Sequence, residues 1–182
     1  MKLIPKVLVP LADGFEDIEA LTVVDVLRRA GVFVVTAGYP GNIIMSKNRI
    51  RVFSDERLID MEDFSRFDGI ILSGGAQSVE SFIKNERFLK IVDYFGKQGK
   101  FIAASSTAPL ILVKLGLLKG KKATILSGLE KHLESPRQGP VVVDGNVVTA
   151  SAPGNSLDFS LKIVEELLGR QKTLKLKEEL GL

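Results

Sequence analysis

The sequence has no cysteine and no tryptophan, and its only histidine is His132. The absence of cysteine excludes disulfides, thiolate metal sites and thiol redox chemistry within this chain. One histidine without cysteine cannot complete a zinc site, so we expect no metal and no cofactor, and we expect His132 to be a solvated surface residue. The scarcity of thermolabile residues, together with many Lys and Glu, favours a heat-adapted source.

Charge of one sign and long apolar runs are also lacking. The 25 Lys and Arg against 22 Asp and Glu leave a net charge of +3, which speaks against a nucleic-acid-binding protein. No apolar stretch reaches the roughly 18 residues of a membrane span. The charged first residues, interrupted by Pro5, lack the apolar region of a signal peptide. We therefore expect a cytoplasmic protein with neither nucleic acid nor membrane as a partner.

Short β-branched runs alternate with segments of helical periodicity, which predicts an α/β fold. We expect a flavodoxin-like doubly wound sandwich, with a mostly parallel central sheet, helices on both faces and small β-hairpin additions. Residues 1–169 would form a single domain, followed by a charged tail, residues 170–182, either helical or frayed. Predicted strands are 6–11, 32–37, 68–72, 101–104 and 123–126; predicted hairpins lie within 43–53 and 141–149; predicted helices are 17–30, 85–99, 107–118 and 156–168.

Local signals refine two of these helices. In the first helix, Ile18 is expected to face the core with the other apolar residues, and Gly31 is a natural stop. In the last helix, Ser156 is expected to be the N-cap.

Three loops follow predicted strands, at residues 13–19, 73–77 and 105–109. In open α/β sheets such loops meet at one crevice, where ligands bind. The backbone N–H groups of Gly74, Gly75 and Thr107 are candidates for an oxyanion or anion site. The alternative for the glycine pair is a tight strand exit without a ligand.

The first and third loops carry the candidate side chains. Glu16 and Asp17 are explained by a favourable interaction with the helix dipole, whereas Glu19 lies one turn further, where partial burial would raise its pKa. Helix-dipole or surface placement is the alternative for Glu19. Ser105 and Ser106 stand at a strand-to-helix turn and are either a nucleophile position or a helix cap.

Four segments in order, residues 14–20 with 24–31, 72–75, 102–109 and 151–156, resemble the motifs of the DJ-1/PfpI/ThiJ superfamily, which is class I glutamine amidotransferase-like. The resemblance covers roughly residues 6–169. It implies a flavodoxin-like fold, a homodimer or larger homo-oligomer and a small carbonyl or anionic ligand. It also implies a nucleophile at Ser106, a protonated glutamate at Glu19 and a pocket that includes Glu16, Ser105, Ser151 and Pro153.

The sequence departs from this pattern at the chemical centre. The family's elbow cysteine is Ser106 here, the histidine of some members is Leu126, and the late-loop arginine of some members is Ser151. A serine hydroxyl is a poor nucleophile without an adjacent base, and sulfur oxidation cannot occur on serine.

Three functional hypotheses follow. The first is a family member without thiol-dependent glyoxalase, deglycase or redox-sensing activity, acting as a binding or stress-related protein. The second is a hydrolase or lyase, glyoxalase- or peptidase-like, that acts on small carbonyl compounds through Ser106 and Glu19. The third is a Cys-to-Ser engineered form of a cysteine-dependent enzyme, which comparison with the genomic sequence would decide.

Overall fold

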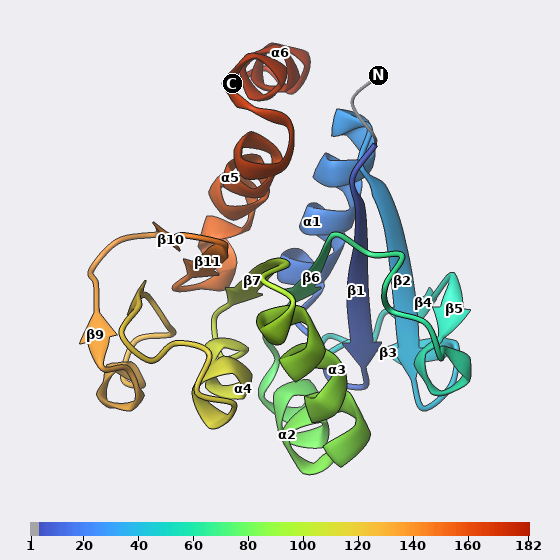
Figure 1. The fold of residues 1–182 in the computed structure, drawn as a ribbon. Coiled ribbons are helices and arrows are strands. Elements are labelled where there is room, and N and C mark those ends of the chain that lie inside the picture. Colours follow the sequence, from blue (N-terminus) through green and yellow to red (C-terminus); the bar gives the residue numbers. More distant parts are fainter. Residues whose placement is uncertain (1–3) are drawn as a thin grey trace.

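The computed structural model describes residues 4–182 and is built on one seven-stranded sheet in the order β10-β11-β7-β6-β1-β2-β5 (Figure 1). All neighbouring pairs are parallel except β10 with β11. The α/β flavodoxin-like prediction is therefore confirmed. The strands of this sheet are β1 Lys6–Ala12, β2 Phe33–Tyr39, β5 Glu56–Arg57, β6 Gly69–Leu72, β7 Phe101–Ser105, β10 Val141–Asp144 and β11 Val147–Ala150.

Helices cover both faces of the sheet (Figure 1). One core is closed by α1 (Asp17–Ala30) and α5 (Ser156–Leu168), the other by α2 (Ala76–Lys84), α3 (Glu86–Lys97) and α4 (Pro109–Lys114). The tail forms α6 (Arg170–Glu179), which buries Thr173 and Leu176. None of the helices within residues 4–182 has the length and apolar composition that crossing a bilayer requires.

Two small sheets lie beside the main one. The first is the predicted hairpin of β3 (Ile43–Met45) and β4 (Arg51–Phe53). The second pairs β8 (Lys122–Ala123) with β9 (Ser135–Pro136). The prediction of a strand over 123–126 was thus wrong in extent and place, because β11 occupies the position beside β7.

The structure corrects several helix details. The segment predicted as helix 107–118 is helical only over 109–114, and Gly116 leaves the helix at φ +70°. Ile18 is 54% exposed rather than buried. Ser156 is the first residue of α5 rather than its cap, and its Oγ donates to the Pro153 carbonyl at 2.5 Å. At α3, in contrast, Asn85 caps the helix by accepting from Phe88 N–H at 3.0 Å.

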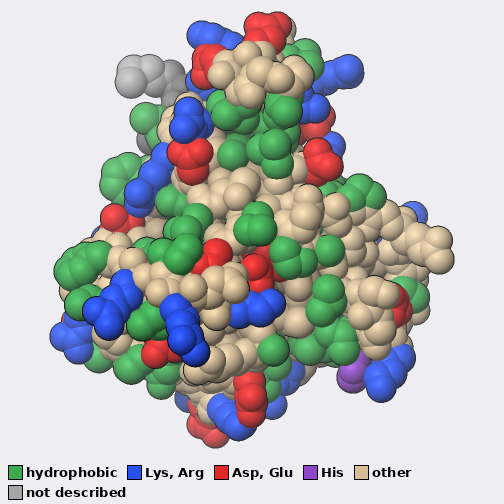
Figure 2. Space-filling view, turned by 180° about the vertical axis from the view of Figure 1, so that it is seen from behind, with side chains coloured by type: hydrophobic (Ala, Val, Ile, Leu, Met, Phe, Trp, Pro, Cys, Tyr) green, Lys and Arg blue, Asp and Glu red, His purple; other side chains and the backbone are tan. Residues whose placement is uncertain are grey.

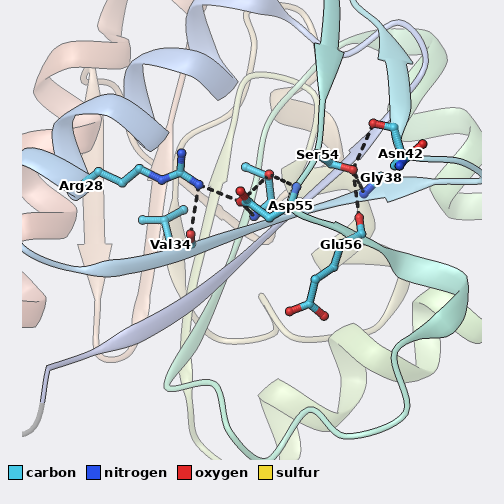
Figure 3. A network of polar contacts seen from close by, with 8 residues as sticks. Arg28, Val34, Gly38, Asn42, Ser54, Asp55 and Glu56 are labelled. Atoms are coloured by element: carbon cyan, nitrogen blue, oxygen red, sulfur yellow. Dashed lines mark hydrogen bonds and ion pairs between the residues drawn. The ribbon is translucent and has the colours of Figure 1, made fainter.

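A polar network holds the edge of the sheet beside β2 (Figure 3). Asp55 accepts hydrogen bonds from the backbone and hydroxyl of Thr36, at 2.8 and 2.7 Å, and pairs with Arg28 at 2.7 Å. Ser54 Oγ accepts from Gly38 N–H at 3.0 Å and donates to the Glu56 carbonyl. Burial raises the pKa of Asp55, but these partners outweigh it and hold the pKa below its usual value. The network anchors the base of the β3–β4 hairpin to the main sheet.

Candidate functional site

Ser106 lies at a sharp turn between β7 and α4, in a left-handed backbone conformation with φ +55°. This conformation costs a non-glycine residue about 1–3 kcal/mol and persists only where the surroundings enforce it. Here its N–H donates to the Ala150 carbonyl at 2.8 Å, and its carbonyl accepts from Leu126 N–H at 3.0 Å. The end of β11 and the segment after β8 therefore fix the backbone of the elbow from both sides.

Neither serine of the elbow is a helix cap. The residue before α4 is Ala108, and no side chain caps that helix. The Ser105 hydroxyl instead donates to Glu19 Oε2 at 2.5 Å. The Ser106 hydroxyl donates to no acceptor within the geometric limits of a hydrogen bond among the described residues. Of the two alternatives, the cap is thus excluded for both residues.

Glu19 is completely buried, whereas the sequence predicted only partial burial. Its Oε2 accepts two hydrogen bonds, from Ser105 Oγ at 2.5 Å and from Gly74 N–H at 2.6 Å. Its Oε1 is buried without a partner among residues 4–182. Burial raises the pKa of Glu19, hydrogen bonds from Ser105 and Gly74 offset part of the rise, and the charge of Glu16 adds to it. When Glu19 is protonated, the proton belongs on Oε1, because Oε2 already accepts twice.

Gly74 lies directly against both groups. A Cβ on Gly74 would lie 2.7 Å from Glu19 Oε2 and 2.9 Å from Ser106 Cβ. Because its N–H is already donated to Glu19, Gly74 is not a free anion donor, which differs from the predicted role. The N–H groups of Gly75 and Thr107 donate to no acceptor within residues 4–182, and they remain available to an oxyanion.

Glu16 and Asp17 have a role that sequence reasoning missed: both are buried and hold the loop of the β3–β4 hairpin. Glu16 pairs with Lys47 at 3.0 Å. Asp17 accepts a hydrogen bond from the Ser46 hydroxyl. It also accepts two from Asn48, one from the backbone N–H at 3.2 Å and one from the side-chain amide at 2.8 Å. Burial raises the pKa of Asp17, but these bonds outweigh it and hold the pKa below its usual value. A favourable interaction with the helix dipole is therefore not the only role of Glu16 and Asp17.

Replacing Asp17 by asparagine is expected to cost about 2 kcal/mol at neutral pH, because an amide would face the two donors of Asn48 with a donor of its own. The lowered pKa means that Asp17 contributes stability above its unfolded-state pKa of about 3.8, and that this stability is lost as the pH falls through the folded pKa. Urea unfolding at pH 7 and pH 3 measures both effects. Asp25→Asn, on the exposed face of the same helix, is the control and should change stability by less than about 0.5 kcal/mol.

An open groove of about 780 Å³ adjoins the elbow. Its walls include Leu126 and Ser151, the residues at two of the three positions where the chain departs from the family pattern. Ser151 Oγ accepts from the Asn155 side chain at 2.9 Å. Pro153, predicted as a pocket residue, begins a short helical turn, Pro153–Asn155, and does not line the groove. His132 is exposed, and within residues 4–182 no cluster of three His, Asp or Glu side chains is arranged to hold a metal ion.

Comparison with known proteins gives a consistent result. The DJ-1/PfpI family matches residues 5–166 of this chain. The protein named DJ-1 homolog B of Arabidopsis thaliana is 36% identical over 178 residues, which is 96% of this chain and 40% of that protein. The chain spans less than half the length of this relative and of the second Arabidopsis relative, DJ-1 homolog A.

Two further similarities cover nearly the whole of both chains. A protein named as a deglycase in Thermococcus kodakarensis is 32% identical over 166 residues, 89% of this chain and 99% of that protein. The solved structure of oxidized Toxoplasma gondii DJ-1 superposes with a TM-score of 0.92 at 30% identity, covering 97% of each chain.

Proposed function

Because this chain belongs to the DJ-1/PfpI family, we propose that it keeps the family's pocket without a nucleophilic thiol and acts as a binding or stress-related protein. One observation carries the proposal: the elbow residue beside buried Glu19 is Ser106, in a chain without cysteine. A serine hydroxyl needs a base to become a nucleophile. Glu19 is a poor base, since its raised pKa favours the neutral acid.

The proposal predicts a gain of activity when sulfur is restored. Ser106→Cys should turn over methylglyoxal at least ~100-fold faster than the wild type, because a thiol beside a neutral carboxyl recreates an acid–nucleophile pair. Ser127→Cys places a thiol at an exposed position of the adjoining groove and is the matched control. Efficient methylglyoxal turnover by the wild type itself would refute the proposal.

A second candidate is a hydrolase or lyase that uses Ser106 and Glu19. It is supported by Glu19 Oε1 and by the N–H groups of Gly75 and Thr107, which have no partner within the described part of the chain and suit an oxyanion. Covalent labelling by a fluorophosphonate, lost in Ser106→Ala, would favour this candidate over the first. Absence of labelling, with no change of any activity in Glu19→Gln, would remove it.

We further propose a cytoplasmic homodimer or larger homo-oligomer. Hydrophobic side chains reach the surface between charged ones on the side of α1 and α5 (Figure 2). Ile18, on α1, is 54% exposed, and Ile50, in the loop of the β3–β4 hairpin, is 49% exposed. The bridge between Phe15 and Ser46 joins the segment before α1 to this hairpin loop. Exposed apolar side chains gathered in this way favour a protein partner. Light scattering during size-exclusion chromatography tests the oligomeric state.

A further inference from the structure

The groove beside the elbow has the size of a ligand site. Its volume of about 780 Å³ lies within the range of roughly 300–1,000 Å³ typical of small-molecule pockets. Most of its wall residues belong to three segments, 124–127 after β8, 136–140 before β10 and 151–155 after β11, and Glu130 also lines it. The apolar wall residues Leu126 and Pro140 offer a surface for the body of an organic molecule.

The groove is connected directly to the elbow through the backbone. Leu126 lines it and donates its N–H to the Ser106 carbonyl at 3.0 Å. On the other side, Ser151 follows Ala150, whose carbonyl accepts the Ser106 N–H at 2.8 Å. Ser106 and Glu19 do not themselves line the groove, but a molecule in it lies against the two segments that hold the Ser106 backbone.

The polar part of the walls offers several hydrogen-bond donors. The Arg137 guanidinium has no carboxylate within 4 Å among residues 4–182, and its one bond is to the Pro136 carbonyl at 2.9 Å. The backbone N–H groups of Gln138 and Gly139 donate to no acceptor among the same residues. The one acidic lining residue, Glu130, already accepts the Gly128 N–H at 2.8 Å.

We propose that the groove is a subsite for the carboxylate end of a small organic ligand, with Arg137 as the recognising residue. A guanidinium binds a carboxylate through two parallel hydrogen bonds, which a neutral group of the same shape cannot match. The apolar body of the ligand then lies along Leu126 and Pro140 towards the elbow. This inference rests on the proposed binding function and specifies the class of ligand.

A pair of probes that differ only in charge tests the inference. Titration calorimetry with 4-phenylbutyrate and with 4-phenylbutanamide compares a carboxylate with its neutral amide on the wild-type chain. We expect the carboxylate to bind about tenfold more tightly, the size of a net charge-assisted hydrogen bond. Arg137→Gln should lose this preference. Arg51→Gln, at another exposed arginine that has no ion pair with any residue from 4 to 182, should keep it.

Two results would overturn the inference. One is equal or undetectable binding of both probes to the wild type, and the other is an unchanged preference in Arg137→Gln with wild-type unfolding behaviour. The same titration on Ser106→Ala separates this inference from the proposed function. We expect that variant to keep the preference for the carboxylate, whatever the activity assay of Ser106→Cys shows.

Discussion

Replacing Gly75 by alanine is expected to destabilise the protein by more than about 4 kcal/mol, a loss large enough to unfold a typical domain. Two costs add at this residue. Its φ of +110° is a conformation that L side chains rarely adopt, and a Cβ would lie 2.2 Å from the Gly14 carbonyl oxygen and 2.9 Å from Glu16 N. Backbone atoms cannot swing away as a side chain can. Glu16 is also held to the same loop by its hydrogen bond to the Gly74 carbonyl at 2.9 Å.

Two other glycines separate these costs. Gly31 has φ +88° but open space around its Cβ position, so Gly31→Ala should show only the conformational penalty of roughly 1–2 kcal/mol. Gly154 has neither strain nor a close neighbour, and Gly154→Ala should be close to neutral. Urea unfolding of the three variants gives the comparison. If Gly75→Ala were no more costly than Gly31→Ala, the close approach of the two loops would not exist in solution.

The sequence predicted those elements whose ends carry local chemical signals. The bounds of α1 and α5 match the predictions of 17–30 and 156–168, because long apolar periodicity and glycines after the last turn are local features. In contrast, α2 was missed, since its nine residues bury only Ser78, Val79 and Phe82. A helix this short leaves too few turns for periodicity to be recognised.

The site was predictable where it depends on loops at strand ends and not where it depends on contacts between them. The apolar neighbours of Glu19 predicted a partly buried carboxyl group with a raised pKa. Its two partners, Gly74 and Ser105, are 55 and 86 residues away. Nothing in the local pattern of residues 46–48 indicated that they would bind Asp17. Arg137 carries no local signal either, because it is an exposed arginine in an irregular segment.

These contacts place two buried carboxyl groups, two residues apart on α1, in opposite electrostatic environments. Hydrogen bonds hold the pKa of Asp17 below its usual value, whereas Glu19 has one oxygen without a partner among residues 4–182. Asp17, with its lowered pKa, fixes the hairpin, and Glu19, with its raised pKa, stands beside Ser106. The two groups should therefore affect folding stability at opposite ends of the pH range.

For Glu19, stability is expected to fall as the pH rises. Its folded pKa lies above the unfolded value of about 4.5, so the stabilisation is complete below that value and is lost as the pH rises through the folded pKa. Glu19→Gln keeps an oxygen to accept from Ser105 and Gly74, but it cannot ionise. The variant should therefore be more stable than the wild type at pH 9 by a few kcal/mol, the effective cost of burying a charge. Near pH 4 the two should differ little.

Urea unfolding across pH 4–9 measures the difference in stability between Glu19→Gln and the wild type. The control is Glu166→Gln, at an exposed position of α5, whose stability should follow that of the wild type throughout. Parallel curves for wild type and Glu19→Gln would show that Glu19 is ionised in the folded protein over this range. In that case the carboxylate could act as a base towards the Ser106 hydroxyl. The same measurement thus decides whether Glu19 is a neutral acid or an ionised base. A neutral acid favours a binding protein in which Ser106 is not activated, and an ionised base favours serine-dependent catalysis.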